Sequence, residues 1–456
     1  MTAWTPELAP EGGPRYLQIA DAIATGIRDG ALRPGDRLPP QRKLAQRLGI
    51  DFTTVSRAYT EAQARRLVDS HVGRGTFIRG AAPASEAADP RRLLGEDLSM
   101  NLPPEVTDPE LLGRMREGLA AVSASLIPLL RYHSATGAEQ DKAAGAAWLS
   151  RRGMAPGLDR IAVTPGAHAA MVAILSTLAR AGDTVLCERI TYPGLRAIAA
   201  RLGLRLVGVA MDDAGVIPEL LEVAIRDHAP KALYLNPVLH NPTTLTVPEW
   251  RRIELAEIVA RHRLPLIEDD AYGFVPAAPP PPFAVLAPAQ TWHIGGLAKC
   301  IGAGLRLAYA VAPDPHAGFA LGQALRAVSV MPSPLCAALA TRWVEEGTAD
   351  RIRDFVRAES AARQQIAATV LGGLDIRTDP EAFNIWLKLP AGAGRAELMG
   401  RMAGRHIGLM PADAFTVGAA PDEHLRVCLG GAISRDDLRA GLLFLANTLS
   451  GGGWMG

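Results

Sequence analysis

Lys299 is the residue of this sequence best placed to carry out covalent chemistry. It lies in a segment of small, otherwise uncharged residues, 294–305, and Arg306 follows it by seven positions. An ammonium group in such surroundings loses hydration, so its pKa falls and the neutral amine can attack a carbonyl carbon. The nearby glycines let backbone N–H groups approach an anion, and Arg306 can bind a phosphate through paired hydrogen bonds. A solvated loop would have the same composition, so this interpretation depends on the rest of the chain.

A second candidate anion site opens a predicted helix over 167–180. Its residues are Gly166, Ala167 and His168, which follow a β-rich run. A helix N-terminus after a glycine offers free N–H groups to an anion, although a plain strand–helix turn would have the same sequence. Tyr192 follows the next β-rich run and can stack on a planar ring.

Three more polar positions stand at or near the ends of predicted strands. Asn241 and Tyr272 follow such runs, and Asp269 stands just past the predicted strand 264–268. A buried carboxylate is costly unless a cation pairs with it, and a pyridinium N–H would be such a partner. Arg426 is a lone arginine in an apolar run, which either a ligand carboxylate or a structural salt bridge would explain.

Short β-rich runs alternate with helical patterns through the second part of the chain, which predicts an α/β fold with a mostly parallel sheet. The runs are 160–164, 184–188, 206–209, 232–235, 264–268, 291–294 and 308–311. Ligands of such folds collect at the carboxyl ends of the strands, where the candidate residues stand.

Length and composition indicate a multidomain globular protein. The chain has 456 residues, 48% of them hydrophobic and 21% charged, too many for one ordinary core. No apolar run is long enough for a transmembrane helix, and the first residues do not form a secretory signal. The four cysteines are far apart, which argues against a metal site and against disulfides and fits a reducing cytoplasm.

The first 79 residues predict a small DNA-binding module. Apolar residues at helical spacing predict a helix ending near Gly30, a second helix beginning at Pro40, and a third over 52–65 capped by Asp51. Residues 67–78 predict a two-stranded ribbon. Residues 1–80 carry 12 Lys and Arg against 8 Asp and Glu, a basic excess that points to an anionic partner but also arises by chance.

This module resembles the winged helix-turn-helix of GntR-type bacterial regulators. The matching motifs are, in order, Gly30-x-Leu32-x-Pro34-Gly35-Asp36-x-Leu38-Pro39, Arg42-x-Leu44-Ala45, Thr54-Val55-x-Arg57-Ala58-Tyr59 and Gly73-Arg74-Gly75-Thr76-Phe77. The resemblance implies that the third helix enters the major groove of double-stranded DNA while the wing reaches the minor groove. The implied DNA contacts are Arg42, Thr53, Ser56, Arg57 and Arg74. Phe52 stands where many relatives carry arginine; it cannot donate to guanine but can contact a thymine methyl.

Residues 80–97 are rich in small residues and proline and predict a linker. The predicted domains are therefore 1–79 and 98–456.

From residue 98 onward the sequence resembles the fold-type I pyridoxal-phosphate enzymes of the aminotransferase class. The resemblance implies that Lys299 is the Schiff-base lysine and that Asp269 pairs with the pyridine nitrogen of pyridoxal 5'-phosphate. The other implied cofactor contacts are Asn241 and Tyr272 to the phenolic oxygen, Tyr192 to the ring, and Gly166, Ala167, His168 and Arg306 to the phosphate. Arg426 matches an arginine that binds a substrate carboxylate, and Tyr132 matches a tyrosine that reaches the neighbouring subunit's site, so a homodimer is expected.

Three positions depart from the aminotransferase pattern. Gly296 and Ala298 stand where relatives often have serines, and Thr244 replaces a glycine. Two hydroxyl contacts near the phosphate are therefore missing, which bears on how tightly the cofactor is held.

The combination of a GntR-type winged helix, a linker and an aminotransferase-like domain resembles the MocR subfamily of bacterial transcription regulators. It implies a PLP-dependent DNA-binding regulator that senses an amino compound, or PLP itself, through Lys299. The alternatives are an active aminotransferase with a DNA-binding appendage, since the residues for transamination are present, and a second domain that is only a dimerisation scaffold. The sequence names neither effector nor operator.

Overall fold

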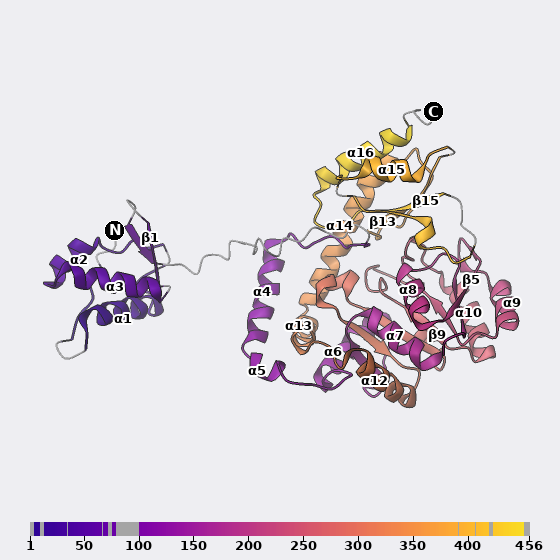
Figure 1. Ribbon diagram of the computed structural model, residues 1–456, viewed down its shortest axis with the longest axis horizontal. Helices are drawn as coiled ribbons and strands as arrows, with labels where there is room; N and C mark the ends of the chain where they lie inside the picture. Colours follow the sequence, from indigo (N-terminus) through magenta and orange to yellow (C-terminus); the bar gives the residue numbers. More distant parts are fainter. Residues whose placement is uncertain are drawn as a thin grey trace. The chain divides into compact units, whose positions relative to one another are not determined.

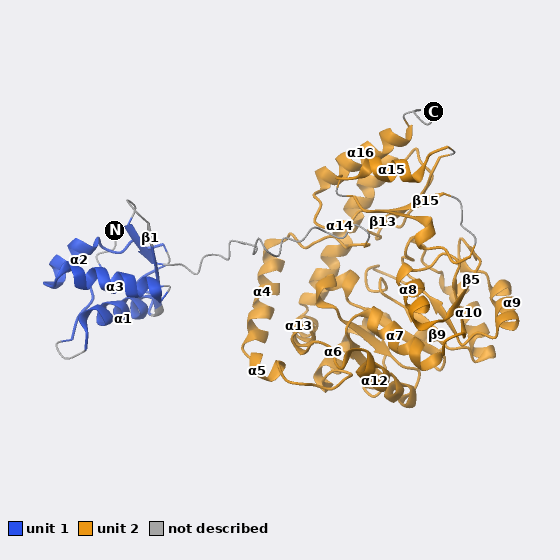
Figure 2. Ribbon diagram, in the orientation of Figure 1, with its two compact units in different colours: residues 1–95 blue, residues 96–456 orange. Residues whose placement is uncertain are grey.

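The computed structural model describes residues 4–9, 13–33, 35–65, 67–71, 75–78, 100–390, 392–405, 407–418 and 423–450. The chain divides into two compact units, Met1–Gly95 and Glu96–Gly456 (Figure 2). Among the described residues, no helix is both long enough and apolar enough to cross a membrane.

The first unit contains three helices and a two-stranded antiparallel sheet. These are α1 (Arg15–Arg28), α2 (Gln41–Leu48), α3 (Phe52–Ala64), β1 (Val68–His71) and β2 (Gly75–Ile78). The side chain of Asp51 caps α3 by accepting from the backbone N–H of Thr53, as the sequence predicts. Pro40 is the N-cap of α2 rather than its first residue. Gly49, with φ 60°, takes the left-handed conformation that turns the chain from α2 towards α3.

A seven-stranded sheet forms the centre of the second unit. Its strands are β3 (Ile161–Thr164), β4 (Thr184–Glu188), β5 (Arg205–Val209), β8 (Ala232–Leu235), β9 (Leu266–Asp269), β10 (Thr291–Gly296) and β11 (Ala308–Val311). They lie in the order β3-β11-β10-β9-β8-β4-β5, and β11 is antiparallel to both of its neighbours while the other pairs are parallel. The predicted mostly parallel sheet is therefore confirmed. The predicted strand 264–268 is shifted, and Asp269 is the last residue of β9 rather than the residue beyond it.

Helices cover both faces of this sheet (Figure 1), because alternate strand residues enter different cores. Ala162, Ala308 and Ala310 pack with α7 and α12, whereas Val163 and Tyr309 pack with α6 and α13. The helices of this large lobe are α4 (Pro109–Ser123), α5 (Leu126–Leu129), α6 (Glu139–Leu149), α7 (Ala167–Leu178), α8 (Pro193–Leu202), α9 (Pro218–His228), α10 (Glu249–His262), α11 (Phe283–Leu286), α12 (Pro315–Ser329) and α13 (Pro334–Glu345). A short hairpin, β6 (Met211–Asp212) with β7 (Gly215–Val216), follows β5.

The C-terminal part forms a second, smaller lobe that the sequence did not predict as a sheet. Four antiparallel strands lie in the order β12-β13-β15-β14. They are β12 (Ile376–Arg377), β13 (Asn384–Lys388), β14 (Leu409–Pro411) and β15 (His424–Cys428), with helices α14 (Thr348–Leu371), α15 (Arg395–Met402) and α16 (Arg435–Ser450). Arg426 lies on β15, so this sheet positions one of the candidate site residues.

Candidate functional site

The carboxyl ends of β3, β4, β8, β9 and β10 all face the same edge of the large sheet, because these strands run in one direction. The predicted cofactor residues of the large lobe follow these ends. Gly166 follows β3, Tyr192 follows β4, Asn241 follows β8, Asp269 ends β9 and Lys299 follows β10.

Lys299 lies in a short π-helical turn, Ala298–Gly302, directly after β10. Its side chain is partly buried, and Nζ donates a hydrogen bond to the main-chain carbonyl of Asn101. Burial lowers the pKa of Lys299 to about 8, and the positive charge of Arg426 acts in the same direction. A substantial fraction of the amine is therefore neutral near pH 7.5, as a nucleophilic lysine requires.

Three consecutive acids, Glu268, Asp269 and Asp270, are buried at the end of β9, and the structure gives them different partners. Glu268 accepts from His293 Nδ1 at 2.9 Å and from the backbone N–H of Phe283 at 2.7 Å. Asp270 pairs with Arg152 at 2.9 Å. Burial alone would raise the pKa of Asp270, but the Arg152 guanidinium outweighs it and holds that pKa below its usual value.

Asp269 differs from both neighbours. Its Oδ2 accepts from the Tyr234 hydroxyl at 2.7 Å, whereas its buried Oδ1 has no hydrogen-bond partner among the described residues. No Lys, Arg or His side chain within the described ranges lies at ion-pair distance from it. Burial raises its pKa to about 6, although the Tyr234 hydroxyl and the backbone N–H of Ala271 both favour the ionised carboxyl. Asp269 is thus a buried acid with an oxygen still available to a donor, and a pyridinium N–H would satisfy it.

An anion cradle is formed by the turn after β3 and by Arg306. Gly166 has φ 86°, and a Cβ placed on it would lie 3.2 Å from Nη2 of Arg306, so the guanidinium lies against this turn. Ala167 begins α7 here, and partial desolvation together with the charge of Arg306 lowers the pKa of His168, although the residue is exposed. Free N–H groups at a helix N-terminus beside an arginine suit a phosphate.

The remaining site residues surround the same region. The ring of Tyr192 meets that of His168 edge-on, with centroids 6.4 Å apart. The Arg426 side chain, which is 2% exposed, crosses from the small lobe to donate to Asn241 Oδ1 at 3.1 Å. Burial keeps the pKa of Tyr272 well above its ordinary value, so the hydroxyl stays protonated.

The departures from the aminotransferase pattern have a structural counterpart. Thr244 adopts φ 61°, a conformation that favours glycine. A Cβ on Gly296 would meet Ala271 Cα at 3.5 Å, which is ordinary contact, so this position has room for a side chain and forgoes a hydroxyl without a steric reason.

The site residues fit a phosphorylated pyridine aldehyde. Asp269 Oδ1 is a buried acceptor that needs a ring N–H, and the turn at Gly166 with Arg306 forms an anion cradle. Lys299 offers an amine whose pKa is lowered.

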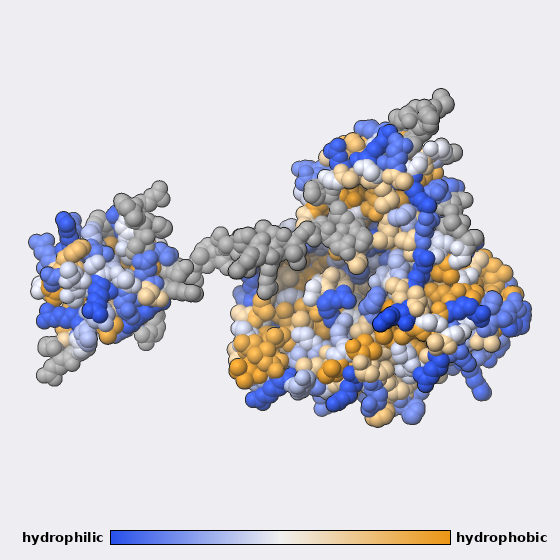
Figure 3. All heavy atoms as spheres, in the orientation of Figure 1, coloured by the Kyte–Doolittle hydropathy of each residue, from blue (hydrophilic) through white to orange (hydrophobic). Residues whose placement is uncertain are grey.

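Tyr132 differs from the buried residues of the site in its exposure to solvent. Its side chain is 89% exposed, and it follows α5 on a surface with other exposed apolar side chains. This apolar surface consists of Leu119, Leu126, Ile127, Leu130 and Tyr132, and Figure 3 shows hydrophobic residues gathered over α4 and α5.

The first unit places most of its predicted DNA contacts at the surface. Arg42, Thr53 and Arg57 are exposed and Ser56 is half-buried, while Arg74 lies outside the described residues. The guanidinium of Arg57 stacks on the Tyr16 ring at 4.2 Å, and that of Arg42 lies 5.9 Å from the exposed ring of Phe52.

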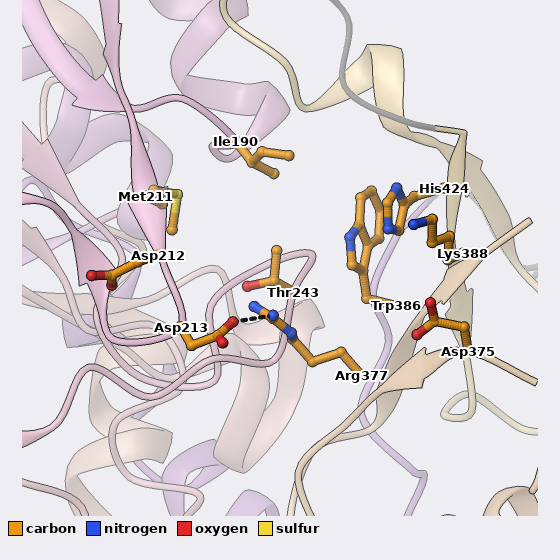
Figure 4. A pocket seen from close by; sticks show the side chains of 10 residues that line it. All are labelled: Ile190, Met211, Asp212, Asp213, Thr243, Asp375, Arg377, Trp386, Lys388 and His424. Atoms are coloured by element: carbon orange, nitrogen blue, oxygen red, sulfur yellow. Dashed lines mark hydrogen bonds and ion pairs between the residues drawn. The ribbon is translucent and has the colours of Figure 1, made fainter.

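A cavity of about 380 Å³ separates β6 from β12, β13 and β15. The side chains of Trp386, Lys388 and His424 line one side, and Met211 and Asp212 line the other (Figure 4). An ion pair between Asp213 and Arg377 joins the two sides. None of the residues predicted to bind a cofactor lines this cavity.

Three residues of the site escaped the sequence analysis. Tyr234 donates to Asp269, Asn101 donates to Tyr272, and Asn384 accepts from Asn101. Tyr234 could have been found from its place on the strand beside β9; the two asparagines gave no local signal.

Comparison with known proteins places both units in families. Residues 15–78 match the bacterial regulatory proteins of the gntR family, and residues 115–442 match aminotransferase class I and II. The chain is 29% identical over 452 residues to the uncharacterized HTH-type transcriptional regulator YdeF of Bacillus subtilis, covering 98% of this chain and 97% of that one. It is 31% identical over 377 residues to the vitamin B6 salvage pathway transcriptional repressor PtsJ of Salmonella typhimurium, covering 82% and 85%.

Among solved structures, the α-aminoadipate aminotransferase LysN of Thermus thermophilus superposes with a TM-score of 0.70 at 24% identity, covering 78% of this chain and 92% of that one. This likeness shows the fold of the second unit. With a winged helix-turn-helix of the gntR family, an aminotransferase class I and II domain, and full-length relatives that are transcriptional regulators, the chain belongs to the MocR subfamily of GntR-type transcription regulators.

Proposed function

We propose that this regulator binds pyridoxal 5'-phosphate through Lys299 and changes its DNA binding in response to an amino compound or to the cofactor itself. The observation that carries the proposal is that three consecutive buried acids have different hydrogen-bond and ion-pair partners. Glu268 and Asp270 have cationic or backbone partners, whereas Asp269 keeps one buried oxygen for a donor that the described protein residues do not supply. A structural acid would be paired like its neighbours.

When bound, the cofactor supplies an aldehyde carbon and an electron-withdrawing ring. The protein residues have separate tasks around it. Asp269 would hold the ring N–H, Arg306 and the turn at Gly166 would bind the phosphate, and Tyr192 would cover the ring face. Tyr272 and Asn241 would contact the phenolic oxygen, and Arg426 would pair with the carboxylate of an incoming amino acid.

The winged helix is proposed to read duplex DNA through α3 and through Arg42, which lies in the first turn of α2. Thr53, Ser56 and Arg57 lie within the first two turns of α3, and Arg74 is assigned to the wing by resemblance. Residues exposed at the start of such a helix are those that reach base edges and phosphates.

A homodimer is part of the proposal. Ile127 and Leu130 are 67% and 63% exposed, and a patch of this kind usually marks an interaction surface. Pairing two copies over this patch would cover it and carry Tyr132 towards the partner's site. Ile127→Glu with Leu130→Glu should therefore give a monomer in sedimentation velocity, whereas a dimer that persists in this variant would remove the patch from the interface.

Spectroscopy combined with DNA binding tests the proposal. The purified protein, incubated with pyridoxal 5'-phosphate, should develop a visible absorption band and a borohydride-fixed adduct on Lys299. Adding the cofactor, and then a panel of amino acids, should change its affinity for DNA from its own promoter region. Stoichiometric keto-acid release over many turnovers would favour a working aminotransferase, and absence of the adduct would exclude the cofactor role of Lys299.

A further inference from the structure

Asn101 connects the segment that follows the predicted linker to two residues of the candidate cofactor site. Its main-chain carbonyl accepts a hydrogen bond from Lys299 Nζ. Its side-chain amide Nδ2 donates to the Tyr272 hydroxyl at 3.1 Å and to Asn384 Oδ1 at 2.9 Å. Asn101 is 2% exposed, so these bonds form away from bulk water.

The main-chain carbonyl of Pro242 determines which atoms donate and which accept in these hydrogen bonds. Asn384 Nδ2 donates to the main-chain oxygen of Pro242 at 2.9 Å, and a carbonyl oxygen can only accept. The amide of Asn384 is therefore fixed with Oδ1 towards Asn101, which must present Nδ2 in return. This leaves Asn101 Oδ1 as a buried acceptor with no partner among the described residues.

The same order fixes the role of Tyr272. Since its oxygen accepts from Asn101, its own proton is directed to another acceptor, and the raised pKa of Tyr272 keeps that proton in place. Asn101 thus orients Tyr272 as a donor while its carbonyl receives the amine of Lys299.

Residues 101–104, which we name the site strap, are also attached to the small lobe. The Pro103 carbonyl accepts from the backbone N–H of Gly431 at 3.1 Å, and Pro104 bridges to Gly431. A Cβ on Gly430 would lie 1.7 Å from the Leu102 oxygen, so a side chain there would displace the strap. The strap is therefore held at one end by Lys299 and Tyr272 and along its length by Gly430 and Gly431, which follow β15.

We propose that Asn101 is a positioning residue for Lys299, and that the site strap transmits the bonding state of the Lys299 amine to the segment leading to the DNA-binding domain. When the neutral amine condenses with an aldehyde carbon, a C=N bond forms, the aldehyde oxygen leaves as water, and Nζ keeps at most one hydrogen. That nitrogen is then fixed in the plane of the new bond, and the Asn101 carbonyl loses its donor. The inference rests on the proposed function in one respect, which is that the aldehyde is pyridoxal 5'-phosphate.

Hydrogen–deuterium exchange of the full chain without cofactor tests the first half. Pro103 and Pro104 have no amide hydrogen, so the readout is the amide of Gly431, which donates to the Pro103 carbonyl. Lys299→Met removes the donor to Asn101 with a side chain one atom shorter, so the Gly431 amide should exchange several-fold faster than in the unmodified protein. Lys388→Met, at an exposed lysine of the small lobe, is the matched control and should leave this exchange unchanged. Equal exchange in the Lys299→Met variant and the unmodified protein would overturn the proposal.

Addition of pyridoxal 5'-phosphate tests the second half. In the unmodified protein the cofactor should accelerate exchange at Gly431 and change DNA affinity. Asn101→Ala keeps the main-chain carbonyl but removes the side-chain hydrogen bonds to Tyr272 and Asn384 that anchor the strap. This variant should bind the cofactor, show fast Gly431 exchange before and after loading, and lose the change in DNA affinity. An Asn101→Ala variant that retains the full DNA response would refute transmission through the strap. Failure of the cofactor to bind would count against the proposed function, while the cofactor-free comparison would still decide the role of Lys299.

Discussion

The two domains hold their functional residues under opposite physical conditions. In the winged helix Arg42, Thr53 and Arg57 are exposed, and they touch their own domain through a ring stack or a cap. In the aminotransferase-like domain Asp269, Arg426 and much of Lys299 are removed from water. Exposed charges can be exchanged at small cost to folding, whereas buried ones are tied to stability. Substitutions of these residues should therefore change DNA binding but not stability in the first domain, and should change both ligand binding and stability in the second.

The largest expected effect is at Lys299. Lys299→Ala should abolish the borohydride-fixed adduct with pyridoxal 5'-phosphate, because no other lysine of the described residues lies in the site. Non-covalent binding and the fold should persist, as measured by equilibrium dialysis and circular dichroism. A stoichiometric adduct in the variant would show that another amine is the attachment point.

A pair of substitutions at the end of β9, Asp270→Asn and Asp269→Asn, tests whether a buried charge always contributes to stability. Asp270→Asn breaks the buried pair with Arg152 and should lower the free energy of unfolding by about 3–5 kcal/mol. Asp269→Asn removes a buried carboxylate that has no cationic partner, so the cofactor-free protein should be as stable as before or more so. Its affinity for the cofactor should fall by roughly tenfold or more, since a hydrogen bond to a charged group contributes about 1.5–3 kcal/mol.

Denaturant unfolding of both variants, with and without cofactor, makes this comparison. If Asp269→Asn unfolds as readily as Asp270→Asn, Asp269 is a structural acid and the cofactor assignment loses its main support.

In the DNA-binding domain, a substitution should weaken ligand binding without lowering stability. Arg57→Ala should weaken binding to the specific operator by about 1–3 kcal/mol if Arg57 reads a base edge. The midpoint of thermal unfolding should change little, because the stack on Tyr16 is at the surface. Arg65→Ala, beyond the other end of α3 and paired with Asp21 and Glu61, is the control and should leave DNA affinity unchanged. Equal losses on specific and random DNA would mean that Arg57 contacts phosphate alone.

The smallest expected effect is a pH dependence set by Asp269. Burial raises its pKa to about 6 from an ordinary value of 3.8, so the cofactor-free fold loses stability as the pH rises from about 3.8 to about 6, and the full cost of the buried carboxylate is present above that range. A bound ring N–H removes that cost. The increase in melting temperature caused by the cofactor should therefore be larger at pH 7 than at pH 5.5, and the part due to Asp269 should disappear in Asp269→Asn. The same pH dependence in both proteins would assign it to the cofactor's own groups.

The sequence predicts the large lobe well because its strands are short apolar runs separated by helical patterns. The runs 184–188, 232–235 and 308–311 coincide with β4, β8 and β11. The small sheet was missed because β12 and β14 contain two and three residues, too few to show a period. Asn101 and Asn384 lie 283 positions apart, and no local pattern records a contact of that separation. The division of roles among Glu268, Asp269 and Asp270 depends on partners from β10, α11 and Arg152, which only the folded chain brings together.

The position of the site strap has a consequence for dissecting the protein. The match to aminotransferase class I and II begins at residue 115, yet Asn101 and Pro103 hold Lys299, Tyr272 and Gly431. A shortened chain that begins at residue 115 would lack the acceptor of the Lys299 amine and expose the buried end of β15. One that begins at residue 98 keeps both. Studies of the isolated second domain should therefore use the longer version, since the shorter one would misrepresent how the cofactor binds.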